Sequence, residues 1–243
     1  MRSRAPFSND ARFRLLGFSA LVAALVFASP WVTSAGATDV PAAPAARHAD
    51  FKDESPSPAV RQMADRVAAS HDNRDAEFVI VDKKAATIYV FDAAATLTGS
   101  TPVLLGAAKG DDSVPGIGER PIADVRPEER TTPAGRFIAE RGRNAQGEDV
   151  VWVDYDAAVS MHRVRANNPK ERRLERLATP TAEDNRISYG CINVPAAFYD
   201  AQIRPIFAKH VAVVYVLPEV KSLQQVFGPS LVAVTAAKAP TRR

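Results

Sequence analysis

A single cysteine, Cys191, most limits how this chain can be held together. One thiol in 243 residues cannot form an intrachain disulfide, so the fold has to rest on a hydrophobic core. Free cysteine has two common uses, as a small buried hydrophobe and as a reactive nucleophile. Which of these two roles Cys191 has depends on the residues around the thiol.

The first 37 residues have the pattern of a secretion signal. Four arginines lie near the start, Leu15–Ser29 is an apolar run, and Ala35–Ala37 supplies small residues for cleavage after Ala37. An apolar run of 15 residues is shorter than the ~20 that a membrane span needs. We therefore expect residues 1–37 to be a signal peptide for export across the inner membrane, with retention as an N-terminal anchor as the alternative.

The net positive charge of the chain comes from residues 1–37. Residues 1–37 hold four arginines and one aspartate, so the remaining 206 residues hold 27 basic and 27 acidic side chains. A balanced charge does not supply the basic face that a nucleic-acid partner requires, and we predict no such partner. One cysteine and four scattered histidines also lack the ligand spacing of a zinc site, so we predict no metal and no other cofactor.

Two segments precede the main domain. Residues 38–58 are rich in alanine and proline, which predicts a disordered linker. Apolar side chains at helical spacing between residues 59 and 73 predict an amphipathic helix, so residues 59–76 are expected to form an N-terminal helical segment. We expect this helix to pack on the domain that follows.

Residues 77–217 are predicted to form a mainly β domain with a few helices, of the α+β class. Apolar runs rich in β-branched residues at 78–81 and 87–91 predict a hairpin at its start. The stretch 109–130 predicts a long surface loop and 195–208 predicts a helix. Residues 218–243 are predicted to form a C-terminal tail with a short helix near 220–227. Further strands are expected at 102–107, 136–140, 150–155, 158–162 and 211–217.

The residues that could carry chemistry gather in two places. Cys191 follows Gly190 in the sequence Arg-Ile-Ser-Tyr-Gly-Cys-Ile-Asn. A thiol becomes a nucleophile at neutral pH when a neighbour favours the thiolate, and an imidazole is the usual neighbour. Of the four histidines only His162 ends a strand-like run, Val159–His162, which would hold its ring at a sheet edge. We therefore pair Cys191 with His162; the alternative is an ordinary histidine with a satisfied ring.

Three segments taken together resemble the L,D-transpeptidase (YkuD-like) catalytic domain of bacterial cell-wall enzymes. They are Thr132–Phe137 (Thr-Pro-Ala-Gly-Arg-Phe), the isolated His162, and Ser188–Asn193 (Ser-Tyr-Gly-Cys-Ile-Asn), in that order. The resemblance covers about Glu77–Leu217 and implies a β-sandwich catalytic domain. It implies that Cys191 is the nucleophile and His162 its proton partner. It also implies that the oxyanion site and the shape of the loop depend on Ser188, Tyr189, Gly190 and Asn193.

The function that the resemblance implies is that of a secreted transferase of peptidoglycan biosynthesis. Such an enzyme forms a thioester between its cysteine and a tetrapeptide stem, then passes the acyl group to the amine of a second stem to make a crosslink. Donor and acceptor stems would be its partners, its place would be periplasmic or cell-wall associated, and its role would lie in wall organisation and cell shape. The alternatives are an L,D-carboxypeptidase or endopeptidase that uses water as acceptor, and a non-catalytic wall-binding descendant.

Tyr189 departs from the family pattern. The family has histidine directly before this glycine, whereas a phenol stays neutral and cannot place a cation beside the thiol. Activation of Cys191 would then depend more heavily on His162. This substitution is the main support for the non-catalytic alternative.

The interval between His162 and Ser188 is a second departure, because its 25 residues are more than the family's usual spacing. We expect Arg163, Arg165 and Arg186 to bind substrate carboxylates, although Arg186 has the alternative of pairing with a local acid such as Asp184. Residues 170–177 predict a short charged helix. Its arginines are expected to be solvated and compensated by their own neighbours: Arg172, Arg173 and Arg176 alternate with Glu171 and Glu175.

Overall fold

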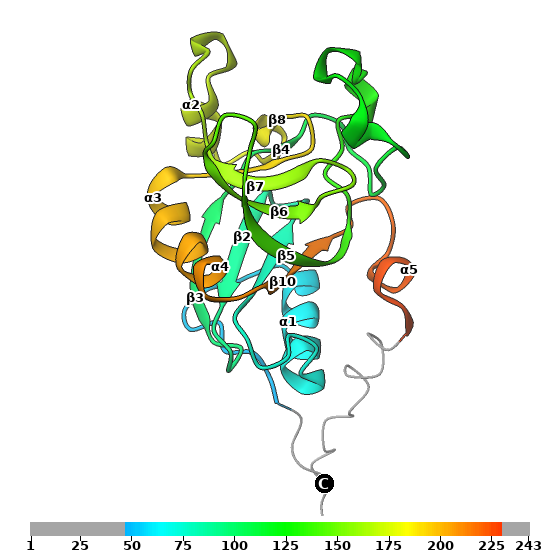
Figure 1. The fold of residues 1–243 in the computed structure, drawn as a ribbon. Coiled ribbons are helices and arrows are strands. Elements are labelled where there is room, and N and C mark those ends of the chain that lie inside the picture. The colour runs from blue at the N-terminus through cyan, green and yellow to red at the C-terminus, as the bar shows by residue number, and fades with distance from the viewer. Residues whose placement is uncertain (1–46, 230–243) are drawn as a thin grey trace, which may run out of the picture. The chain divides into compact units, whose positions relative to one another are not determined.

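One long strand joins two packed halves of an eight-stranded sheet in the computed structural model, which describes residues 47–229 (Figure 1). The strand order is β3-β2-β1-β10-β5-β6-β7-β9. The joining strand is β5 (Gly135–Arg143): its residues up to Ala139 pair with β10, and those from Glu140 pair with β6. The prediction of a mainly β domain with a few helices is confirmed.

The first half of the sheet is built on the predicted hairpin. β1 (Phe78–Asp82) and β2 (Thr87–Phe91) pair antiparallel, and β10 (Ala212–Leu217) runs parallel to β1 on its other side. The outer strand is β3 (Leu97–Pro102), which the sequence did not predict. Its residues are mostly small and polar, as in many edge strands, so no apolar alternation reveals it.

The second half of the sheet carries the candidate functional residues. It contains β6 (Asp149–Asp154), β7 (Val159–Arg163) and β9 (Ile192–Val194), with β7 and β9 parallel. A separate two-stranded sheet joins β4 (Leu105–Gly106) to β8 (Arg186–Ser188). The strand expected at 102–107 is therefore the end of β3 followed by β4.

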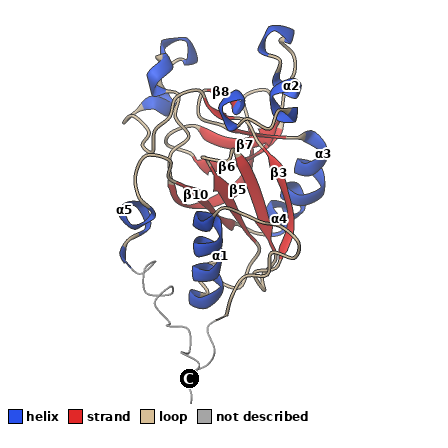
Figure 2. Cartoon of the chain, turned by 180° about the vertical axis from the view of Figure 1, so that it is seen from behind, coloured by secondary structure: helices blue, strands red, loops and turns tan. Residues whose placement is uncertain are grey.

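Side chains on the two faces of β1 enter two separate cores. Val79 and Val81 pack in the core between the two half-sheets. Phe78 and Ile80 pack in a second hydrophobic cluster, beneath α1 (Pro58–Ser70). This explains why β1 is a continuous apolar run rather than an alternating one. Helix α1 lies across the first half of the sheet (Figure 2). Its buried residues are those of the predicted apolar stripe: Val60, Met63, Ala64, Val67 and Ala68.

The helix expected at 195–208 is present in three parts. α3 (Ala196–Phe198) continues through a π-helical segment, Tyr199–Ile203, into α4 (Arg204–Lys209). Pro205 has no N–H to give to the helical ladder, and a widened turn accommodates that loss. Tyr199 and Ile203 are buried in the core between the half-sheets.

Two long connections flank the β4–β8 pair, on opposite sides in both views (Figures 1 and 2). Residues 109–130 form the predicted loop, in which three short 3-10 turns occur: Ile117–Glu119, Ile122–Asp124 and Pro127–Glu129. The other connection runs from β7 to β8 and contains α2 (Arg173–Ala178), close to the helix expected at 170–177. Two further 3-10 turns flank α2: Pro169–Glu171 and Ala182–Asn185.

The packed domain extends past the boundaries expected at residues 59 and 217. Phe51 is buried with its ring edge-on to Phe91, 5.4 Å between centroids, so the end of the expected linker is part of the core. After β10, Glu219 lies in a buried ion-pair cluster, and α5 (Leu223–Phe227) follows. The expected signal peptide, 1–37, and the start of the linker lie outside the described residues. Within 47–229, no helix combines the length and apolarity of a membrane span.

Candidate active site

Parallel pairing of β7 and β9 brings the thiol and the imidazole together. His162 lies on β7 opposite Asn193 of β9, and Cys191 directly precedes β9. The Cys191 thiol is half-buried and interacts with the His162 ring, and each of the two groups shifts the pKa of the other. The structure thus joins the two residues that sequence reasoning paired.

The electrostatics of this pair favour its charged form. Burial raises the pKa of Cys191, but the hydrogen bond and charge of His162 outweigh it and hold that pKa below its ordinary value. Burial lowers the pKa of His162, but the hydrogen bond and charge of Cys191 raise it above its ordinary value. Both shifts stabilise a thiolate beside an imidazolium, which is the reactive state of a nucleophilic cysteine.

A backbone carbonyl sets the orientation of the imidazole. The Nδ1 of His162 donates to the carbonyl oxygen of Arg163 at 2.8 Å. This bond places the proton on Nδ1 in the neutral ring and leaves Nε2 as the nitrogen that can take the thiol proton. The ring is therefore held in the tautomer that a general base requires.

Ser160 is a site residue that sequence reasoning missed. Its Oγ lies 3.7 Å from the Sγ of Cys191, and the carbonyl oxygen of Ala158 lies 3.6 Å from the same sulfur. The backbone and side chain of Ser160 both act to lower the thiol pKa. Ser160 and His162 are two apart on one strand and so point to the same face, which is the signal that could have found it.

The turn before the thiol requires glycine. Gly190 has a φ of 130°, in the region that favours glycine, and a Cβ at this position would lie 2.8 Å from the carbonyl oxygen of Thr131. Ser188 supports the turn from the side. Its Oγ accepts from the Gly190 N–H at 3.1 Å and donates to the Cys191 carbonyl at 2.6 Å.

The peptide groups on both sides of Cys191 are fixed by side chains. Thr132 Oγ1 donates to the Gly190 carbonyl at 2.8 Å and accepts from the Gly106 N–H at 2.9 Å. Asn193 Nδ2 donates to the Cys191 carbonyl at 3.2 Å. Because a peptide is trans, the Cys191 N–H points the opposite way from the Gly190 carbonyl and therefore away from the buried Thr132.

The side chain of Tyr189 lies at the surface and not beneath the nucleophile loop. Its side chain is 40% exposed, and the guanidinium of Arg130 lies over its ring, 4.1 Å from the centroid. A cation–π contact of this kind holds the ring in place. The position that carries histidine in the family pattern thus holds a tyrosine covered by an arginine from the 109–130 loop.

The three arginines expected to bind substrate are already paired within the protein. Arg163 contacts Asp149 at 2.9 Å and Asp200 at 2.6 Å. Arg165 pairs with Glu148 at the surface.

Arg186 is paired deep in the structure. Its side chain is 8% exposed and contacts Glu219, with a further bond of 2.7 Å to the Lys83 carbonyl. Its acidic partner is therefore Glu219 and not Asp184. The sequence could not indicate this pair because Glu219 lies in the segment expected to be a tail.

A groove opens on the His162 side of the pair. Its volume is about 400 Å³, and its wall includes Arg163 and Arg165 together with Asp149 and Glu148. The groove thus reaches the imidazole, and Cys191 is not among the residues that line it. Its full lining is Arg143, Gly147, Glu148, Asp149, His162, Arg163, Val164, Arg165, Ala166, Asn167 and Ala196.

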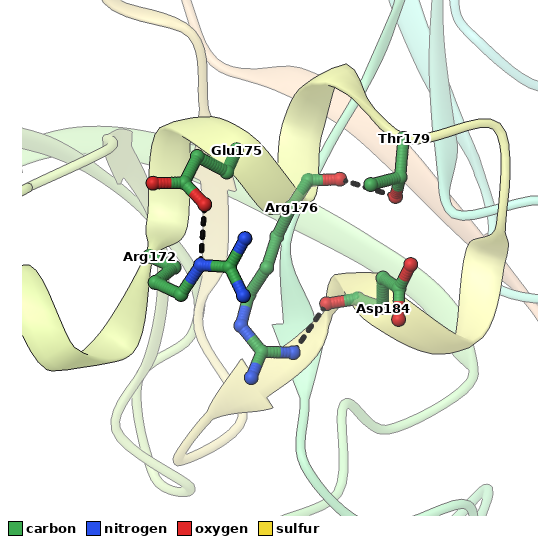
Figure 3. Close-up of a pocket in the computed structure, with 5 residues that line it drawn as sticks. All are labelled: Arg172, Glu175, Arg176, Thr179 and Asp184. Atoms are coloured by element: carbon green, nitrogen blue, oxygen red, sulfur yellow. Dashed lines mark hydrogen bonds and ion pairs between the residues drawn. The ribbon is translucent and has the colours of Figure 1, made fainter.

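A smaller pocket of about 140 Å³ lies within the α2 connection (Figure 3). Arg172 pairs there with Glu175, and Arg176 donates to the Asp184 carbonyl at 2.7 Å. Arg172 is thus compensated by Glu175 as expected, whereas Arg176 donates to backbone carbonyls of the same connection. Among residues 47–229, no three His, Cys, Asp or Glu side chains lie close enough to hold a metal ion.

Comparisons with known proteins return matches in solved structures alone; no family model and no curated protein matches. An L,D-transpeptidase from Mycobacterium smegmatis is 16% identical, with a TM-score of 0.35 over 58% of this chain and 58% of that one. One from Stackebrandtia nassauensis is 16% identical, with a TM-score of 0.35 over 67% and 68%. The helical cell shape determining protein of Campylobacter jejuni is 13% identical, with a TM-score of 0.39 over 66% and 55%. The match spans little more than half the length of the Mycobacterium and Campylobacter proteins.

Proposed function

We propose that this protein is an exported cysteine acyltransferase of the L,D-transpeptidase type, which acts on peptidoglycan stem peptides through a thioester on Cys191. The observation that carries the proposal is the interaction of Cys191 with His162, which the parallel pairing of β7 and β9 brings together. Their pKa values are shifted in the directions that favour a thiolate and an imidazolium. The motif resemblance supplies the substrate class, and residues 1–37 supply the route of export.

In the first half of the reaction the thiolate is the nucleophile. Its sulfur attacks the carbonyl carbon between the third residue and the terminal D-residue of a tetrapeptide stem, and a C–S bond forms. The carbonyl electrons move to oxygen and return as the C–N bond breaks. The leaving amine takes its proton from the His162 imidazolium. The product is a thioester on Cys191 and a free D-amino acid.

In the second half His162 acts as the base. Its neutral ring takes a proton from the acceptor amine, whose nitrogen attacks the thioester carbonyl. The C–S bond breaks as the new amide forms, and the thiolate and imidazolium are restored. With water as acceptor the same steps release a tripeptide, so groove shape and exclusion of water decide the product.

The fixed loop supports stabilisation of the oxyanion in both halves. The Cys191 N–H is directed away from Thr132 by the bond between Thr132 and the Gly190 carbonyl. Its direction is set before substrate binds, and donors placed in advance are the main source of oxyanion stabilisation. Tyr189 is not required for any of these steps.

Two measurements on the exported protein test this proposal. Tetrapeptide muropeptides should yield crosslinked dimers, and whole-protein mass spectrometry should find a covalent adduct after exposure to a carbapenem. Both should be lost in Cys191→Ala, whereas Ser188→Ala should reduce them. Tripeptide monomers without dimers would assign the hydrolase instead. No turnover and no adduct at any carbapenem concentration would leave a wall-binding protein as the better account.

A further inference from the structure

Arg173 differs from the other arginines of α2. Its Nη1 donates to the Oδ1 of Asn193 at 2.5 Å, and its Nε contacts Glu171 at 2.5 Å. Its side chain is 15% exposed, whereas that of the neighbouring Arg172 is 70% exposed. The expectation that Arg173 is solvated is therefore wrong, because this guanidinium turns inward to β9.

Asn193 links Arg173 to the nucleophile through a second hydrogen bond. The amide of Asn193 accepts from Arg173 with its oxygen and donates to the Cys191 carbonyl with its nitrogen, at 3.2 Å. An amide bonded at both ends has a single favourable orientation. Because the donor on the oxygen side is a charged guanidinium, this bond is stronger than a neutral one.

We propose that Arg173 is a positioning residue for Cys191, acting through Asn193, so that the α2 connection forms part of the active site. The proposal deepens the proposed function and rests on Cys191 being its nucleophile. The long connection between His162 and Ser188 would then have a role in the active site. It places the guanidinium of Arg173 against Asn193 of β9, the strand that follows the thiol.

The charge of Arg173 also acts on the imidazole. It opposes protonation of His162 and so offsets part of the rise in the pKa of that ring. All three cations near the ring face carboxylates: Arg173 contacts Glu171, Arg163 contacts Asp149, and Arg165 contacts Glu148. Arg143 also lines the groove and donates to the Gly147 carbonyl. Removing Arg173 should therefore move the titration of His162 to higher pH.

Two readouts on the full chain test the proposal without any peptidoglycan substrate. The rate of Cys191 alkylation by iodoacetamide reports the thiol, and a nuclear magnetic resonance titration of the His162 ring reports the imidazole. Arg173→Met keeps most of the side-chain volume, Arg173→Lys keeps the charge, and Arg172→Met is the matched control.

In Arg173→Met we expect the alkylation rate at neutral pH to fall roughly tenfold, the equivalent of about one charged hydrogen bond, because the loss of thiol positioning outweighs the gain in imidazolium. The His162 midpoint should rise. Arg173→Lys should restore the midpoint and part of the rate, and Arg172→Met should match the wild type in both. A purely structural role would lower the unfolding temperature without moving the midpoint.

The proposal is overturned if folded Arg173→Met matches Arg172→Met in both rate and midpoint. If the Met variant does not fold, Arg173→Gln replaces it and the same comparison decides. Because iodoacetamide needs no substrate site, these results stand even if carbapenem and muropeptides do not react. Failure of the proposed function and failure of this inference are therefore seen in different assays.

Discussion

Replacing Thr132 with valine should loosen the nucleophile loop and destabilise the protein measurably. Thr132 is fully buried, and its hydroxyl makes two bonds, to the Gly190 carbonyl at 2.8 Å and from the Gly106 N–H at 2.9 Å. Valine has nearly the same shape but offers neither a donor nor an acceptor. Both backbone groups would then be buried without these partners.

The expected magnitude follows from those two bonds. A buried polar group left without its partner costs about 1–3 kcal/mol. Two such groups, with no change in side-chain volume, give an expected loss of roughly 2–4 kcal/mol in the free energy of unfolding. Thr131→Val is a matched control, since that hydroxyl makes a single bond, to the Asp112 carbonyl at 2.7 Å, for which about 1 kcal/mol is expected.

Urea unfolding measures the loss of stability, and iodoacetamide alkylation measures the loop. Iodoacetamide should alkylate Cys191 more slowly in Thr132→Val than in the wild type at neutral pH. The alkylation rate in Thr131→Val should equal that of the wild type. If Thr132→Val is no less stable than Thr131→Val and its thiol reacts at the wild-type rate, then Thr132 does not hold the loop as described.

Three further predictions concern the backbone turn and the buried cation. Gly190→Ala should reduce alkylation of the thiol and lower stability by about 1–3 kcal/mol, because φ is 130° and the new Cβ would lie 2.8 Å from a carbonyl oxygen; calorimetry tests this. Lys83→Met should cost about 3–5 kcal/mol, since it leaves the buried Asp111 carboxylate without its cation at 2.7 Å; urea unfolding tests this. Burial opposes ionisation of Asp111, but the Lys221 N–H and Lys83 bring its pKa from 3.8 to about 2. Its contribution to stability is therefore complete above pH 3.8 and lost as pH falls toward about 2, and acid unfolding of Asp111→Asn should lack that part of the pH dependence.

Local patterns were enough to predict most of the sheet. β1 and β2 are runs of β-branched and aromatic residues whose burial decides their conformation, and they pair in the predicted hairpin. β3 was not predicted because its small polar residues carry no periodic signal. Its place is set by pairing with β2, which is a tertiary contact.

The candidate site was predictable only where chain order carries information. Cys191 and His162 could be paired from a motif, because each stands in a distinctive short segment. Arg173 and Arg186 could not be placed, since Arg173 belongs to a run of charges that looks solvated in sequence and Arg186 was expected to bind a substrate carboxylate or Asp184. Their surroundings depend on which distant residue meets them, Asn193 for the first and Glu219 for the second.

The ultraviolet absorbance of the thiolate, followed against pH, tests the ion pair of Cys191 and His162 most directly. We expect a thiolate signal that persists well below the ordinary thiol pKa of ~8.5, is absent in Cys191→Ala and moves to higher pH in His162→Ala. A wild-type thiolate that forms only near that ordinary value, unchanged by His162→Ala, would contradict the account.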